Sequence, residues 1–195
     1  MLLEGLAQNQ AGVNAEMTVL LHERGDAGDR ITTPGSEDRR LVSRVLHRVM
    51  GGGAGRALPR LNDVDPWLIG GDWANCALIS VRQPHAQSVF TVVGDKLLPT
   101  GTALVHEPIS KCPARTLLGI ILPYFGQAVD VRACLMLEGG ADLFDRPILY
   151  RGLLLPLSED NKKIDAVLIA ANFGDVRKGE ENRAVTRLVW SHSFG

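Results

Sequence analysis

Residues 146–173 read RPILYRGLLLPLSEDNKKIDAVLIAANF, and this stretch decides the predicted fold. Two apolar runs, residues 148–157 and 164–173, flank the polar segment SEDNKK. Runs rich in Leu, Ile and Val that are separated by Ser, Asp and Asn predict a long antiparallel hairpin. Neither run alternates between apolar and polar residues, so we expect both faces of the hairpin to be covered. Pro156 has no amide hydrogen, which predicts a strand end, an edge or a bulge at that position.

A hairpin of two strands is only marginally stable in water, so the rest of the chain must supply partner strands and a covering layer. Residues 76–81 and 88–93 predict a second strand pair, and residues 131–138 predict a fifth strand. Together these segments predict an α+β fold, with a five-stranded antiparallel sheet and helices on one face.

Proline and aspartate mark the expected helices between these strands. Asp65 and Pro66 predict the N-cap and first residue of a short helix, and Trp67 is expected to anchor that helix to the sheet edge. Pro113 is expected to open a helical stretch further on, and Pro123 to kink or end it.

An amphipathic helix is predicted at residues 36–50, capped by Ser36 and followed by a glycine hinge that extends to residue 56. Its apolar residues recur at the spacing of one helix face, and we expect that stripe to pack on the same domain or to form a homodimer contact. The stripe consists of Leu41, Val42, Val45, Leu46 and Val49.

The other face of this helix is basic. The simpler interpretation is a solvated arginine face. A nucleic-acid interface is an alternative, and it would use Arg39, Arg40, Arg44 and Arg48. Residues 1–35 are expected to be a flexible segment, and residues 175–195 a tail with helical spacing at Ala184, Val185, Leu188 and Val189.

Composition excludes several classes of protein. The chain has 195 residues, a formal net charge of −1 and 45% hydrophobic residues, which are ordinary values for a globular protein. This charge gives no global bias toward nucleic acid or anionic membrane. No apolar stretch is long enough to span a membrane. The three cysteines are odd in number and widely spaced, which favours reduced thiols in the cytoplasm over a disulfide framework.

Three motifs point to a known family. They are NDVDP at residues 62–66, SVFTVVG at residues 88–94, and YRGLLLPLSED at residues 150–160 with the apolar run that follows it. With these motifs, residues 57–173 resemble a bacterial branch of the PAS (Per-Arnt-Sim) domain family, often found as short single-domain proteins. The resemblance implies a five-stranded antiparallel sheet with helices over one face, used for sensing or for protein interaction. It also implies that a ligand would lie between the helical middle and the sheet.

Five residues are candidate ligand contacts: His106, Cys112, Tyr124, Arg132 and Tyr150. The resemblance motivates the first two, because some PAS relatives bind haem through a histidine or flavin through a reactive cysteine. The arginine and the two tyrosines lie near predicted strands, where they could orient a small carboxylate or an aromatic ligand. The simpler interpretation makes the cysteine a small buried hydrophobic residue, the arginine a solvent-facing group and the two tyrosines rim residues.

The sequence contains no catalytic constellation, and its five histidines lack the spacing of a zinc site. We therefore predict a cytoplasmic PAS-like module of bacterial signalling that binds a small effector or a signalling protein. We expect it to act without catalysis, cofactor, nucleic acid or membrane. The alternative is a haem- or flavin-dependent redox or light sensor, or an enzyme.

Overall fold

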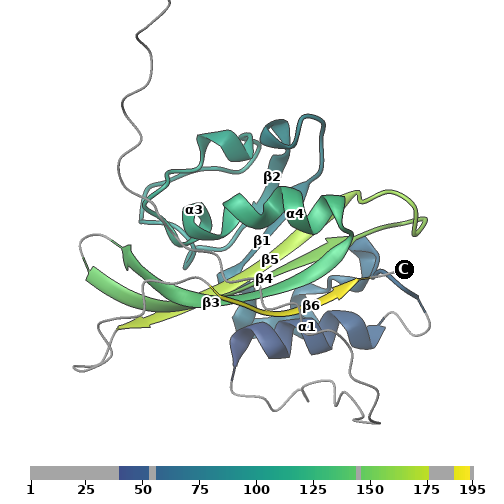
Figure 1. Cartoon of the computed structure of the whole chain (residues 1–195), viewed down its shortest axis with the longest axis horizontal. Coiled ribbons are helices and arrows are strands. Elements are labelled where there is room, and N and C mark those ends of the chain that lie inside the picture. Colours follow the sequence, from purple (N-terminus) through teal and green to yellow (C-terminus); the bar gives the residue numbers. More distant parts are fainter. Residues whose placement is uncertain (1–39, 53–55, 144–145, 176–186, 194–195) are drawn as a thin grey trace, which may run out of the picture.

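The computed structural model describes residues 40–52, 56–143, 146–175 and 187–193. Six strands in these ranges form one antiparallel sheet in the order β2-β1-β5-β4-β3-β6 (Figure 1). The strands are β1 (Cys76–Ser80), β2 (Val89–Val93), β3 (Ala133–Leu143), β4 (Arg146–Leu157), β5 (Ala166–Asp175) and β6 (Arg187–Ser193).

The predicted hairpin is the centre of this sheet. Strands β4 and β5 pair along their length, from Ile148 opposite Asp175 to Leu157 opposite Ala166. Three consecutive leucines of β4, Leu153, Leu154 and Leu155, are completely buried. Successive side chains of a strand point to opposite faces, so both faces of the hairpin are covered, as predicted.

Proline and turn residues define the end of the hairpin. Pro156 lies next to the last residue of β4, beyond the point where β3 begins to pair at Leu135 opposite Leu154. The register gives Pro156 a partner on β5, Val167, and none on β3, and a proline is tolerated near such a strand end. In the turn, the Asp160 Oδ1 accepts hydrogen bonds from the amides of Lys162 (2.7 Å) and Lys163 (2.9 Å).

The first strand pair joins the hairpin through β1, which pairs with β5 from Cys76 opposite Ala170 to Ser80 opposite Ala166. The five predicted strands therefore lie in one antiparallel sheet. Their bounds differ from the predicted ones by a few residues, most at the C-terminal end of β3, which extends to Leu143.

The prediction of a helical tail is wrong for Arg187–Ser193, which form β6 and pair with β3 from Ala133 opposite Ser193 to Glu138 opposite Arg187. Valine and tryptophan in this segment suit a strand, and the outer edge of β3 offers unpaired amide and carbonyl groups. Pairing with that edge outweighs the helical spacing of the tail. The remainder of the predicted helix, residues 180–186, lies outside the described residues.

Helices cover both faces of the sheet rather than one, which corrects the predicted architecture. Figure 1 shows α1 (Leu41–Gly52) on one side and α3 (Leu117–Ile121) and α4 (Phe125–Asp130) on the other. The reason is the central hairpin, whose two apolar faces each need cover. Shorter helices complete the fold: η1 (Leu61–Asp63), α2 (Pro66–Ile69), η2 (Gly70–Asn75), η3 (His85–Gln87), η4 (Ile109–Lys111) and η5 (Leu122–Tyr124).

The α1 helix matches the prediction where it is described. It begins at Leu41, while Ser36, its predicted cap, lies outside the described residues together with the segment 1–35. Gly51 and Gly52 are the last helical residues, and positions 53–55 of the predicted hinge also lie outside the described ranges.

The short helix α2 has the predicted cap, because the Asp65 Oδ1 accepts a hydrogen bond from the Trp67 amide at 2.8 Å. The predicted role of Trp67 is wrong. Its side chain is 93% exposed, so it does not anchor α2 to the sheet. Trp73 does pack partly against the core.

The segment α3–η5–α4, here called the roof, lies over the face opposite α1. Pro123 sits in η5 and separates the two α-helices, as predicted. The first helix starts at Leu117 and not near Pro113, since the Thr116 Oγ1 accepts from the Gly119 amide at 3.0 Å and donates to the Pro113 carbonyl at 2.7 Å. That hydroxyl makes Thr116 the N-cap.

Two glycines allow the roof to come close to its neighbours. A Cβ on Gly119 would lie 2.4 Å from the Pro113 carbonyl oxygen. A Cβ on Gly152, in the middle of β4, would lie 2.9 Å from the Cδ1 of Ile121. The roof therefore rests directly on the central strand.

We predict that Gly119→Ala destabilises the fold by about 1–3 kcal/mol, because the added methyl group would overlap backbone atoms that cannot rotate away. Urea unfolding measures this change. Gly71→Ala is the matched control, since nothing lies within 4 Å of its Cβ, and it should change the free energy by less than about 0.5 kcal/mol. An equal effect of both substitutions would contradict the close contact at Gly119.

Candidate functional site

An open cavity of about 480 Å³ lies at one end of the sheet, and we call it the loop pocket. Its volume is in the range of small-molecule sites. Its lining consists of Val81, Arg82, Gln83, Val129, Asp130, Arg132, Lys162, Lys163 and Ile164.

Three connections meet at this pocket: the loop after β1, the junction between α4 and β3, and the β4–β5 turn. Strand register brings the first and third together, because β1 ends where its antiparallel neighbour β5 begins. The Val81 amide donates to the Asp165 carbonyl at 2.9 Å. The Ser88 Oγ accepts from the Arg82 amide at 3.0 Å and so shapes the β1–β2 loop.

Arg132 connects the second junction to the turn. Its Nη2 donates to the carbonyl oxygen of Asn161, which is 29 positions away in the sequence. Both residues have left-handed backbones, with φ of 51° for Arg132 and 59° for Asn161. Such conformations are costly for residues with a Cβ and persist where the surroundings hold them. The Arg132 Nε is buried and has no hydrogen-bond partner among the residues that the structure describes.

The structure does not bring the five predicted ligand residues together. Arg132 lines the loop pocket, but the other four lie elsewhere. His106 is exposed, with φ of 70°, and Tyr150 is buried in β4 opposite Gly139 and Phe173. Tyr124 is half-buried in η5.

The other basic residues of the pocket were not predicted as site residues. Arg82, Lys162 and Lys163 belong to polar connections that the sequence marks as turns. The antiparallel pairing of β1 with β5 was the signal that could have found them, because it places those two connections at the same end of the sheet.

The cysteines are not activated as nucleophiles. Burial raises the pKa of Cys76 to about 12 and also raises the pKa of Cys134 and Cys112. These thiols are therefore protonated near neutral pH, whereas a reactive cysteine needs a thiolate. Cys112, the predicted flavin or haem contact, is half-buried with its Sγ 3.6 Å from the Thr116 Oγ1.

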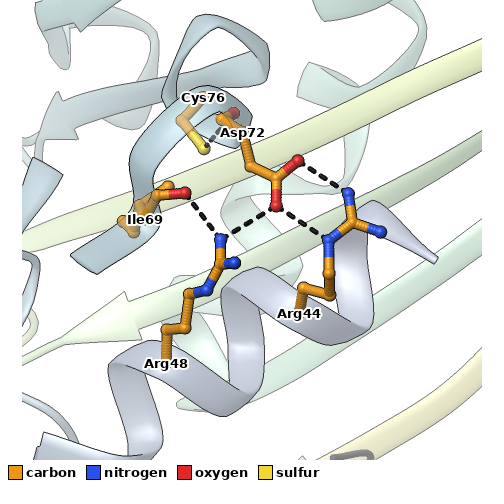
Figure 2. A network of polar contacts seen from close by, with 5 residues as sticks. All are labelled: Arg44, Arg48, Ile69, Asp72 and Cys76. Carbon is orange, nitrogen blue, oxygen red and sulfur yellow. Dashed lines mark hydrogen bonds and ion pairs between the residues drawn. The ribbon is translucent and has the colours of Figure 1, made fainter. Parts of the chain in front are cut away.

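A second charged cluster, here called the arginine clamp, joins α1 to η2 (Figure 2). Arg44 binds Asp72 through two hydrogen bonds, from Nε to Oδ2 (2.9 Å) and from Nη2 to Oδ1 (2.7 Å). Arg48 donates from Nη1 to the same Oδ2 (2.9 Å) and to the Ile69 carbonyl (2.6 Å). The Asp72 side chain is only 15% exposed, so these charge-assisted bonds are partly shielded from water.

The arginine clamp bears on the nucleic-acid alternative. Arg44 and Arg48 share one carboxylate inside the domain, which is a structural use of two of the four arginines in that hypothesis. The simpler interpretation, a solvated arginine face, is also wrong for Arg44 and Arg48, because both bind Asp72. Arg39 lies outside the described residues.

The apolar stripe of α1 is covered within the chain itself. Leu41, Val42, Val45, Leu46 and Val49 are at most 6% exposed. They belong to the same core as the buried residues of β4 and β5, the strands that α1 contacts. The stripe packs on its own domain, so it supplies no argument for the predicted homodimer contact.

The described ranges contain no group of three or more His, Cys, Asp or Glu side chains that could hold a metal ion. Among the same residues, no helix has the length and apolarity required to cross a membrane. Neither finding argues for or against a ligand in the loop pocket.

Comparisons with known proteins returned nothing: no family model, no curated protein and no solved structure matches this chain.

We predict that Asp72→Asn lowers the free energy of unfolding by about 1–3 kcal/mol near neutral pH, because both arginines lose their charged acceptor. The hydrogen bond from Arg44 holds the pKa of Asp72 below its ordinary value of 3.8. A lowered folded-state pKa stabilises the fold above the unfolded-state pKa, and that contribution disappears as the pH falls through the folded-state value.

The difference between the wild type and Asp72→Asn should therefore shrink below about pH 4. Urea titrations at neutral and acid pH measure it. Asp95→Asn removes the charge of an exposed aspartate and serves as the control. A difference that stays constant with pH would show that the carboxylate charge does not stabilise α1.

Proposed function

We propose that this chain is a PAS-like sensory or protein-interaction module of bacterial signalling, which binds a small effector or a partner protein and catalyses no reaction. One observation carries the proposal: the long hairpin and the earlier strand pair share one antiparallel sheet, with the irregular roof packed over one face. This agrees with what the resemblance to the PAS family implies. The helix α1 on the opposite face and the strand β6 are additions to that arrangement.

The space beneath the roof is filled by the protein's own side chains. Leu118, Ile121 and Phe125 are at most 1% exposed, and Ile121 occupies the place of a side chain on Gly152. A small effector is therefore better accommodated in the loop pocket than between the roof and the sheet. Asp130, the last residue of α4, lines that pocket, so binding there would act directly on the roof.

A cytoplasmic location belongs to the same proposal. Its support is that all three cysteines are free thiols, as expected in a reducing compartment.

Native mass spectrometry of the intact chain tests the effector hypothesis. We expect a small-molecule adduct after incubation with a metabolite extract, lost on denaturation, and a higher melting temperature in its presence, because a ligand that binds only the folded state stabilises it. The absence of both an adduct and a shift would remove the small effector from the proposal.

An absorption spectrum of the same sample tests the alternative of a haem or flavin sensor. A visible band that belongs to a bound chromophore would establish that alternative and replace the cofactor-free module. A colourless adduct supports the present proposal.

Protein contact is a second candidate function, favoured by the exposure of Trp67 (93%) and Leu68 (62%) on α2. We propose a second copy of this chain as the partner, which keeps the predicted homodimer and moves its contact from α1 to α2. A tryptophan this exposed contributes little to folding, but aromatic side chains contribute strongly to interfaces.

Trp67→Ser should change the free energy of unfolding by less than about 0.5 kcal/mol and should weaken the dimer. Light scattering over a range of concentrations measures the mass. Trp73→Ser is the control, since this partly buried tryptophan packs on the core and its loss should lower stability. A wild type that stays monomeric at every concentration would exclude the homodimer.

A further inference from the structure

The loop pocket concentrates positive charge in a chain whose formal net charge is −1. Four basic side chains line it, from three separate connections: Arg82, Arg132, Lys162 and Lys163. Asp130 is the one acid of that lining. The excess of cations is therefore local and does not reflect a basic protein.

The carboxylates near the pocket already have partners. The Asp130 Oδ1 lies 3.5 Å from the Nε2 of His85. Asp160 uses its Oδ1 to accept two amide hydrogens of the turn. Asp165 lies 3.9 Å from the Nζ of Lys163.

Two of the four cations form no close ion pair, although the charge of Lys162 interacts with the Asp160 carboxylate. Neither Arg82 nor Lys162 has a carboxylate within 4 Å of its charged group in the part of the chain that the structure describes. Positive groups that line one cavity repel each other where acids are too few to balance them, and an anion bound between them would relieve that repulsion.

Arg132 provides a fixed part of the site. Its bond to the Asn161 carbonyl holds the guanidinium against the turn, and its buried Nε has no acceptor among the described residues. A buried donor without a partner is uncommon in native proteins and is often explained by a ligand or an ion.

The rest of the lining consists of the polar residue Gln83 and three apolar residues. Val81, Val129 and Ile164 form a wall beside the cations. A volume of about 480 Å³ also exceeds what a single inorganic anion needs. The combination fits a ligand with one strongly charged end and a compact apolar body.

We propose that the loop pocket binds a small organic phosphate, with its phosphate group among Arg82, Arg132 and Lys162 and its apolar body on the wall of Val81, Val129 and Ile164. This inference rests on the proposed function, because it names the chemical class of the effector. A phosphate carries a charge near −2 on several oxygens and accepts donors from several directions. A single carboxylate is planar and is satisfied by one arginine fork, so it uses this arrangement less fully.

Isothermal titration calorimetry with the full chain tests the inference, with phenyl phosphate as the probe at low ionic strength. Inorganic phosphate and benzoate are the comparison ligands, since each has only part of the chemistry. We expect phenyl phosphate to bind about tenfold more tightly than either. Equal binding of inorganic phosphate would overturn the organic ligand, and equal binding of benzoate would overturn the preference for phosphate.

Charge-matched variants show whether the binding occurs in the pocket. Arg82→Ala and Lys162→Ala should each weaken phenyl phosphate binding about tenfold, since each removes a cation that forms no close ion pair. Arg151→Ala and Lys96→Ala remove the same charge from exposed residues outside the pocket and should leave the affinity unchanged. Equal losses in both sets, or no binding by the wild type, would overturn the site.

The two proposals fail differently. If Lys162→Ala leaves the mass-spectrometric adduct and its thermal shift intact, the effector binds elsewhere; the pocket assignment is then wrong while the sensory function stands. If the adduct is absent but phenyl phosphate binds in the pocket, the anion site stands without a natural effector.

Discussion

Both faces of the β4–β5 hairpin are apolar, and the rest of the fold keeps water away from them. A completely buried leucine contributes about 1.5–3 kcal/mol relative to an exposed one, and β4 alone contains three in succession. Helices on only one face would leave the apolar side chains of the other face in water, and those side chains would then not contribute this stabilisation. The chain before β1 therefore supplies α1 for one face, and the chain between β2 and β3 supplies the roof for the other. The direct contact of Ile121 with the backbone of Gly152 shows how closely the roof rests on the centre of the hairpin.

The same hairpin determines where charge collects. Most residues of its strands are apolar, and the basic residues of its turn, Lys162 and Lys163, lie at its end. Antiparallel pairing brings the loop after β1 to that end, and the bond from Arg132 to Asn161 adds the α4–β3 junction. A cationic pocket is thus formed by connections, while the sheet contributes only its geometry.

Arginines have different uses in this molecule. Arg44 and Arg48 bind Asp72 and attach α1 to η2, which makes them part of the scaffold. Arg82 lies beside an open cavity with no carboxylate near its guanidinium in the described residues. An arginine is structural here when another segment places an acid next to it, and it is a candidate binding residue when no acid is close. The arginine side chain itself is the same in both cases.

Local chemistry in the sequence determined the hairpin, the cap at Asp65, the interruption at Pro123 and the amphipathic pattern of α1. Each of these depends on residues only a few positions apart, whose spacing, hydrogen-bonding groups or missing amide act within one turn or strand. Only the tertiary structure decided that Arg187–Ser193 pair with β3, that Trp67 faces solvent, and that Arg132 meets Asn161. Those outcomes depend on groups that distant segments bring to the same place. The tail has helical spacing in the sequence, yet Arg187–Ser193 form a strand. The unpaired edge of β3 offers hydrogen-bond partners for their backbone.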